Sequence, residues 1–173
     1  MAKVVMNEME MNRALTRLAY EIIERNRGVE NIILVGIETR GVPIAKRLAA
    51  KLEQLEEAVI VESLDIRPYR DDIKSSYQAP ADASDFSGKK IILVDDVLFT
   101  GRTTRAAIEN IFDMGRPANI QLAILIDRGH RQLPFRADYV GKNVPTAITE
   151  HIDVEVKEVD GQDRVILLKE EEG

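Results

Sequence analysis

The chain has 173 residues, a length that suits one domain, because a single core rarely divides below about 250 residues. Hydrophobic residues make up 45% and charged residues 31%, an ordinary globular composition that excludes a disordered or fibrous protein. No stretch approaches the roughly 18 apolar residues that cross a bilayer, and the first residues lack the apolar core of a secretory signal. We therefore expect a cytoplasmic protein without a membrane partner.

The chain contains no cysteine, and its two histidines, His130 and His151, stand alone without ligand spacing. This excludes disulfides, thiol nucleophiles and Cys-built metal centres, and it argues against a metal site built on histidine. The formal net charge of −6 opposes indiscriminate nucleic-acid binding, although a local basic patch is compatible with it. The acidic tail at 169–173 is expected to be solvated.

The first half of the chain predicts helices and strands in alternation. Apolar residues recur at helical spacing over 10–26 and Gly28 follows, which predicts a helix that ends there. The apolar run 31–37 predicts a strand buried on both faces. A helix with Pro43 in its first turn and a strand over 59–66 come next.

The second half opens with a polar stretch, 67–90, that lacks periodicity and predicts a lid over a site. A strand over 90–95 follows, then a helix that begins near Thr103 and ends at Gly115. Residues 121–127 supply one more strand. The alternation continues, so the chain is expected to build an α/β domain.

Near the C-terminus, strands at 154–156 and 165–168 flank Asp160-Gly161, which predicts a β-hairpin. Strands that alternate with helices predict a mostly parallel central sheet. Ligands bind such sheets beyond the carboxyl ends of the strands. The loops expected to meet there are 38–41, 67–90, 95–103 and 127–137.

The most informative segment is 91–104, which reads IILVDDVLFTGRTT. A buried strand delivers Asp95 and Asp96, and a short loop then leads through Gly101 into the start of a helix. Free amides at a helix N-terminus, beside Thr hydroxyls and a glycine, form a cradle for phosphate. Two ionised carboxylates accept hydrogen bonds from vicinal hydroxyls. Together these groups describe a site for a ribose 5-phosphate.

Competing interpretations have less support. The sequence has no G-x-G-x-x-G after its first strand and no G-x-x-x-x-G-K-[ST], which argues against dinucleotide and P-loop sites. In a simpler interpretation, Asp95 and Asp96 merely end a strand while Thr103 caps a helix, but the complete motif argues against it. The loops also offer no adjacent Ser-His pair. This suits glycosyl transfer through an oxocarbenium-like state, which depends on positioning and charge stabilisation.

The segment 91–104 resembles the phosphoribosyl pyrophosphate motif of type I phosphoribosyltransferases. Further motifs, found in the same order, resemble the bacterial pyrimidine operon attenuation regulators that are also uracil phosphoribosyltransferases. The resemblance covers about residues 11–161 and implies the type I fold, with a hood over 127–150 and one domain over 1–173. The further motifs are RALTR at 13–17, VGIETRG at 35–41, YRDD at 69–72, DRGHR at 127–131 and RADYVGKNVPT at 136–146.

The resemblance implies transfer of ribose 5-phosphate from phosphoribosyl pyrophosphate to uracil, which gives UMP and pyrophosphate. In that reaction Asp95 and Asp96 hold the ribose hydroxyls, and Arg40 neutralises the pyrophosphate. Arg128 lies in the hood over the base, and Mg²⁺ enters with the pyrophosphate substrate. The implied substrate-binding residues are Thr39, Arg40, Asp95, Asp96, Val97, Leu98, Phe99, Thr100, Gly101, Arg102, Thr103, Arg128 and Ile152.

The resemblance also implies binding to a hairpin in pyrimidine-operon leader mRNA, with UMP or UTP as the effector, by a homodimer or homotetramer. Residues 128–142 carry four basic residues against one acidic residue, and polar residues recur on one face of the first helix. The family often has His where this chain has Tyr20, and Arg67-Pro68 also departs from its usual sequence. The implied RNA-binding residues are Thr16, Arg17, Tyr20, Arg131, Arg136 and Lys142.

Two other functions remain open on the sequence. One is a purely catalytic type I phosphoribosyltransferase for another base, such as hypoxanthine, against which the hood motif at 127–131 argues. The other is an RNA-binding regulator with little catalysis, against which Asp95, Asp96 and Arg40 argue.

Overall fold

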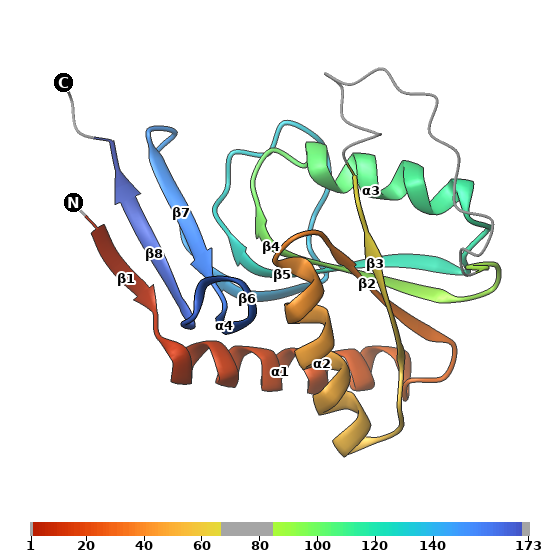
Figure 1. Cartoon of the computed structure of the whole chain (residues 1–173). Helices are drawn as coiled ribbons and strands as arrows, with labels where there is room; N and C mark the ends of the chain where they lie inside the picture. The colour runs from red at the N-terminus through yellow and green to blue at the C-terminus, as the bar shows by residue number, and fades with distance from the viewer. Residues whose placement is uncertain (1, 67–84, 171–173) are drawn as a thin grey trace.

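The structure, a computed structural model, describes residues 2–66 and 85–170. Most of the expected lid, including Arg67, Pro68 and the motif at 69–72, lies outside the described residues, as do the last three residues of the acidic tail. Two sheets organise the rest of the chain (Figure 1). None of the helices in the described ranges is long and apolar enough to span a membrane.

The larger sheet has five strands, all parallel, in the order β3-β2-β4-β5-β6. Every residue of β2 is buried, as expected for a parallel strand with both faces covered. The strands are β2 (Ile32–Ile37), β3 (Ile60–Leu64), β4 (Lys90–Leu98), β5 (Asn119–Asp127) and β6 (Tyr139–Asn143). The predicted α/β class with a parallel central sheet is confirmed.

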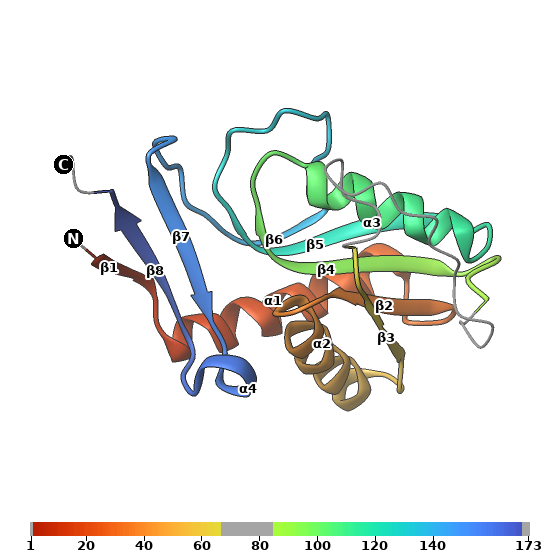
Figure 2. The same cartoon turned by 45° about the horizontal axis from the view of Figure 1, so that its top comes forward.

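Helices cover both faces of this sheet. In Figure 2 α3 (Arg102–Asp113) lies on one side, and α1 (Glu8–Asn26) and α2 (Gly41–Leu55) lie on the other. Alternate residues of β4 enter the two cores because successive side chains of a strand point to opposite faces. Ile92 therefore packs in the core of α1 and α2, whereas Ile91 packs in the core of α3.

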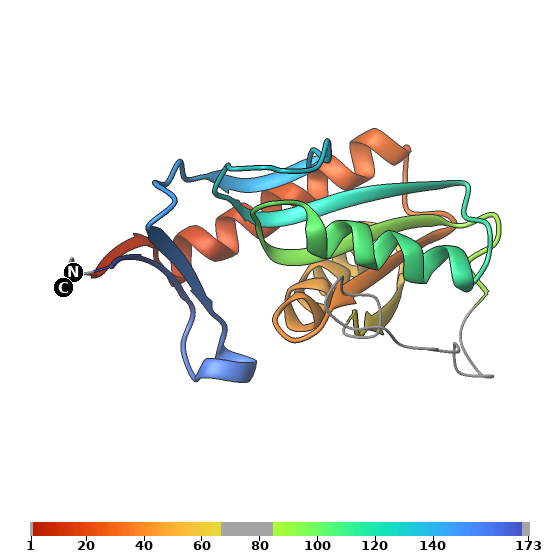
Figure 3. The ribbon, with the colours of Figure 1, turned by 90° about the horizontal axis from the view of Figure 1, so that it is seen from above.

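The smaller sheet is antiparallel, in the order β1-β8-β7, and it stands at one end of the molecule (Figure 3). It consists of β1 (Ala2–Met6), β7 (Glu150–Glu155) and β8 (Arg164–Lys169). The predicted C-terminal hairpin is therefore confirmed, but a short helix, α4 (Lys157–Asp160), replaces a simple turn. Gly161 ends α4 with a left-handed φ of 81°.

Several boundaries differ from the sequence prediction. Helix α1 starts at Glu8 because the side chains of Asn7 and Glu10 form a capping box. Strand β4 continues to Leu98, paired with β5, so the two aspartates lie within the strand and the expected loop 95–103 is shorter. Strands β1 and β6 were not predicted. Their mixed burial gives no clear alternation, and pairing with β8 and β5 stabilises them.

Candidate active site

The candidate site lies where the strand order of the larger sheet reverses. From β2 the chain passes through α2 to β3 on one side, whereas β4 leads through α3 to β5 on the other. Loops that leave neighbouring strands in opposite directions open a crevice beyond the carboxyl ends of the strands. In this chain the two loops are 38–40 after β2 and 99–101 after β4, and the crevice is expected between them.

Two glycines let the start of α2 pack closely against strands β2 and β4. A Cβ at Gly41 would lie 2.4 Å from the carbonyl oxygen of Val94, and one at Gly36 would lie 2.6 Å from the Cα of Val42. Both contacts are with backbone, so a side chain has no room there. As a result, Gly41 lies against Val94 and Asp95, directly after Thr39 and Arg40 in the chain. The Glu38–Thr39 peptide bond is cis.

Asp95 and Asp96 are partly buried near the end of β4. The amide of Asp96 donates to Oδ1 of Asp95 at 2.8 Å, and the amide of Val97 donates to Oδ1 of Asp96 at 2.8 Å. Burial and the neighbouring charge of Asp96 raise the pKa of Asp95. The pair offers carboxyl oxygens at the crevice, as a diol-binding site requires.

The start of α3 is built to receive an anion. Gly101 is its N-cap, with a φ of +94°, and makes no side-chain capping hydrogen bond within the described structure. The hydroxyl of Thr100 accepts from the amide of Arg102 at 3.3 Å, and Thr103 lies in the first turn. Thr103 therefore does not cap α3, contrary to the simpler interpretation of the motif. Main-chain amides at such an end, with the helix dipole, favour phosphate.

The loop after β5 braces this helix start. The amides of Gln132 and Leu133 donate to the carbonyl oxygen of Thr100 at 2.8 and 3.0 Å, and Nε of Arg102 donates to Gln132 at 3.1 Å. A Cβ at Gly101 would lie 3.2 Å from the ring of Phe135. The cradle and the predicted hood are therefore packed together.

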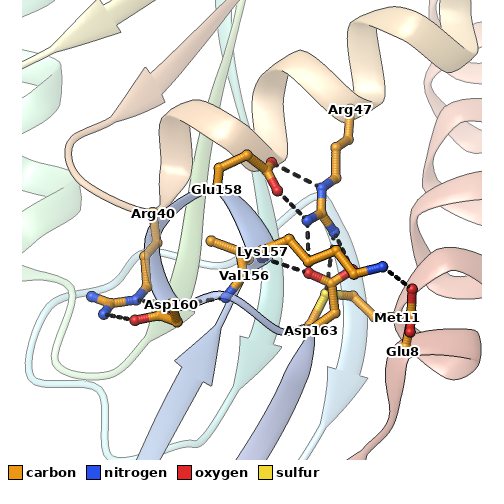
Figure 4. A network of polar contacts seen from close by, with 9 residues as sticks. All are labelled: Glu8, Met11, Arg40, Arg47, Val156, Lys157, Glu158, Asp160 and Asp163. Atoms are coloured by element: carbon orange, nitrogen blue, oxygen red, sulfur yellow. Dashed lines mark hydrogen bonds and ion pairs between the residues drawn. The ribbon is translucent and has the colours of Figure 1, made fainter.

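Arg40 forms the N-cap of α2 and extends toward the smaller sheet (Figure 4). Its Nε and Nη2 atoms donate to the two carboxylate oxygens of Asp160 at 3.1 and 2.8 Å. These hydrogen bonds, together with the charges of Asp96 and Asp153, raise the pKa of Arg40. Asp160 was expected only as a turn residue, because no sequence signal relates it to an arginine 120 positions away.

Arg128 is buried under the hood segment, with only 6% of its surface exposed. Its guanidinium donates to the hydroxyl of Thr146 at 3.1 Å and to the carbonyl oxygen of Glu150 at 2.6 Å, and it lies over the ring of Phe99. Burial lowers its pKa. Arg128 therefore joins the loops after β4 and β5, and a cavity of about 360 Å³ lies between 127–131 and 143–146.

The remaining substrate-binding candidates, Val97, Leu98 and Ile152, contribute to the hydrophobic core. Leu98 is buried and Val97 is half-buried, so both support the end of β4 from within the core. Ile152 lies in β7, opposite Leu167, and packs against the core of α1 and α2.

Two of the RNA-binding candidates, Arg17 and Lys142, lie at the junction of α1 and β6. Nη2 of Arg17 donates to the carbonyl oxygens of Val140 and Gly141, at 3.1 and 2.6 Å. Lys142 follows directly and donates to the carbonyl oxygen of Val5 at 2.8 Å. The patch on the first helix and the basic segment 128–142 thus adjoin at these two residues.

The other members of this set have different surroundings. Tyr20 is 56% exposed, and Arg136 is also exposed. Thr16 is fixed by Lys51, whose Nζ donates to its hydroxyl at 2.9 Å. Arg131 forms an ion pair of 3.1 Å with Asp127, at the end of β5. The set therefore extends from α1 to the border of the candidate active site.

Within residues 2–66 and 85–170, no three His, Asp or Glu side chains cluster to hold a metal ion. Magnesium is commonly bound through one or two carboxylates together with the phosphates of a substrate. The adjacent Asp95 and Asp96 fit that mode of binding, in which the substrate supplies the remaining ligands.

A parallel sheet with an acidic strand end and a helix that starts at a glycine at its switch point is the arrangement found in the phosphoribosyltransferase class of the α/β proteins. The fold is similar to that of the hypoxanthine phosphoribosyltransferase of Trypanosoma cruzi, with a TM-score of 0.74 at 20% identity over 98% of this chain and 97% of that one. A second structure of the enzyme from that organism, a mutant in a ternary substrates complex, gives a TM-score of 0.76 at 22% identity over 97% and 95%.

The family model "phosphoribosyl transferase domain" matches residues 3–159, and the chain belongs to that family. It is 56% identical over 171 residues to a bifunctional protein PyrR of Streptococcus equi subsp. zooepidemicus, covering 98% of this chain and 99% of the relative. A bifunctional protein pyrR of Enterococcus faecalis is also 56% identical, over 172 residues, covering 96% and 97%. The predicted family and type I fold are confirmed.

Proposed function

We propose that the chain transfers ribose 5-phosphate from phosphoribosyl pyrophosphate to uracil, forming UMP and pyrophosphate. The observation that carries this proposal is the meeting of Asp95 and Asp96, the start of α3 and Arg40 around one crevice. Similarity to bifunctional PyrR proteins over almost the whole chain supports uracil as the base.

Each part of the crevice has one task in this reaction. Asp95 and Asp96 accept hydrogen bonds from the ribose hydroxyls, and the amides and hydroxyls of 100–103 bind the 5-phosphate. Arg40, beside Thr39, neutralises charge on the departing pyrophosphate. Mg²⁺ bound with the substrate supplies further charge stabilisation there. The site therefore accelerates transfer through positioning and electrostatics, without a protein nucleophile.

The loop that carries Arg128 borders the base in this proposal. Because Arg128 is held by Phe99, Thr146 and Glu150, its role is to fix the two loops between which uracil binds.

We also propose that the chain binds pyrimidine-operon leader mRNA, in response to UMP or UTP. The surface on which Arg17 contacts β6, next to Lys142, supports this second function, since basic side chains neutralise phosphates and Tyr20 can stack on an unpaired base. Arg131 pairs with Asp127 at the end of β5, which relates this surface to the nucleotide site. The protein acts in the cytoplasm as a homodimer or homotetramer, each chain forming one domain over 1–173.

The deciding experiment is UMP formation from uracil, phosphoribosyl pyrophosphate and Mg²⁺, run beside orotate, hypoxanthine and guanine. Turnover with uracil alone is the expected result. Turnover with a purine would refute the assignment of the base. No turnover with any base, together with tight UMP binding, would instead favour a regulator that uses the pocket as a sensor. A gel shift with leader RNA, with and without UMP, tests the second function.

A further inference from the structure

The turn between β7 and β8 makes a row of ionic contacts with α2 (Figure 4). Arg40 and Arg47 are seven residues apart, about two helical turns, so they lie on the same face of α2. The two arginines have different partners. Arg47 pairs with Glu158 and with Asp163, whose Oδ1 is 2.7 Å from Nη2, whereas Arg40 pairs with Asp160.

Arg47 and its partners hold the turn in place. The amide of Lys157 also donates to Asp163, at 2.8 Å, and the ammonium group of Lys157 contacts Glu8 of α1. The turn is therefore bound to both α1 and α2, independently of Arg40. The position of Asp160 therefore depends on contacts of the turn that do not involve Arg40.

The Asp160 carboxylate is also anchored by the main chain. Its Oδ2 atom accepts from the amide of Val156 at 2.9 Å, in addition to its contacts with Arg40. The hydrogen bonds from Arg40 hold the pKa of Asp160 below its ordinary value, so this group remains an ionised acceptor at neutral pH.

The contact uses one edge of the Arg40 guanidinium. A guanidinium has five N–H donors, and Asp160 takes one from Nε and one from Nη2. The outer edge, with Nη1 and the second Nη2 hydrogen, is left for a phosphate, which arginine binds in a fork. About a third of the Arg40 side chain, 36%, is exposed. Asp160 therefore orients Arg40 and does not block it.

We propose that Asp160 is a positioning residue for Arg40, held by the α4 turn so that the outer edge of the guanidinium faces the pyrophosphate group of the substrate. The inference rests on the proposed function of Arg40. A free arginine loses considerable side-chain entropy when it binds a ligand, and a side chain that is already oriented loses less. The antiparallel sheet thereby contributes to substrate binding without touching the substrate.

The test compares Asp160→Asn with Glu158→Gln, which removes a charge from the same turn but contacts Arg47. Steady-state kinetics at varied phosphoribosyl pyrophosphate should show that Asp160→Asn raises the KM for this substrate about fivefold. This factor corresponds to the upper end of the free energies measured for partly exposed ion pairs. The KM for uracil should be unchanged. Glu158→Gln should stay within about twofold of the wild type. Thermal melts establish that each variant is folded. If Asp160→Asn does not fold, Asp160→Glu, which keeps the charge but shifts the carboxylate, replaces it.

A double-mutant cycle separates positioning from a general structural effect. If Asp160 acts through Arg40, Asp160→Asn should change the KM no further in an Arg40→Ala background. An equal rise in both backgrounds would overturn the inference, and so would an unchanged KM in the folded single variant.

Calorimetric binding of phosphoribosyl pyrophosphate with Mg²⁺ distinguishes this inference from the proposed function. A wild type that binds this compound but transfers to no base would refute the reaction, while weaker binding by Asp160→Asn would still support positioning. A wild type that turns over uracil at the same KM as Asp160→Asn would refute the inference alone. Absence of binding by the wild type would refute both.

Discussion

The guanidinium of Arg128 lies 4.0 Å from the centroid of the Phe99 ring, so the first residue after β5 covers the first residue after β4. An arginine over an aromatic face is attracted by the ring quadrupole, and burial strengthens that attraction. Because the same guanidinium binds Thr146 and Glu150, one side chain joins three segments around the site.

Replacement of Arg128 by alanine should therefore destabilise the protein. The variant loses the ring contact and leaves the carbonyl oxygen of the partly buried Glu150 without this donor, so we expect the free energy of unfolding to fall by about 2–4 kcal/mol. Urea denaturation measures it. The exposed Arg13→Ala is the control and should change it by less than about 0.5 kcal/mol. Equal values for the two variants would show that Arg128 does not stabilise the loops.

Asp95→Asn should stabilise the protein at neutral pH while it abolishes ribose binding. The pKa of Asp95 is raised in the folded state, so between the ordinary carboxyl pKa and the raised one the folded chain binds more protons than the unfolded chain. The free energy of unfolding of the wild type therefore decreases as pH rises through this window. Asparagine removes that dependence.

Urea denaturation of both proteins, repeated at intervals from acidic to neutral pH, tests this expectation. The two stabilities should be similar where Asp95 is protonated in both states and should diverge in favour of Asp95→Asn as pH rises. A wild type that remained the more stable protein at neutral pH would contradict the role assigned to burial and Asp96.

Gly41→Ala should cost more than an ordinary glycine replacement. The new Cβ would lie 2.4 Å from the backbone oxygen of Val94, so loop 38–41 or β4 has to move. We expect the free energy of unfolding to fall by more than about 3 kcal/mol and substrate binding to weaken. Gly88→Ala is the matched control. Gly88 has a positive φ, and no atom lies within 4 Å of a Cβ placed there, so Gly88→Ala should lower the free energy of unfolding by only about 1–2 kcal/mol. Similar losses at both positions would exclude a steric effect.

Arg40→Ala should lower turnover while RNA binding is preserved, and Arg136→Ala should do the reverse, because the two arginines lie on different parts of the surface. UMP formation and gel shifts at several salt concentrations measure both functions. Each lost phosphate contact weakens binding uniformly and reduces the salt slope by about one unit. Equal impairment of both functions by each folded variant would refute separate surfaces.

The sequence by itself determined the fold class and was sufficient to predict a candidate site in the segment 91–104. The apolar run at 31–37 and the strand that contains Asp95 and Asp96 are local patterns. The transition from strand to helix at 98–103 is indicated by the adjacent glycine and threonine residues. Such features depend on neighbours in the chain, so hydrophobic periodicity and residue type are sufficient to predict them.

Tertiary structure alone decided what lies around that loop. The contacts of Arg40 with Asp160 and of Arg17 with β6 join residues more than 100 positions apart, and strands β1 and β6 form only because β8 and β5 offer unpaired edges. These relationships depend on how the two sheets pack, which no local pattern specifies. The sequence therefore predicted the groups of the candidate site, and only the folded chain determined which residues hold them in position.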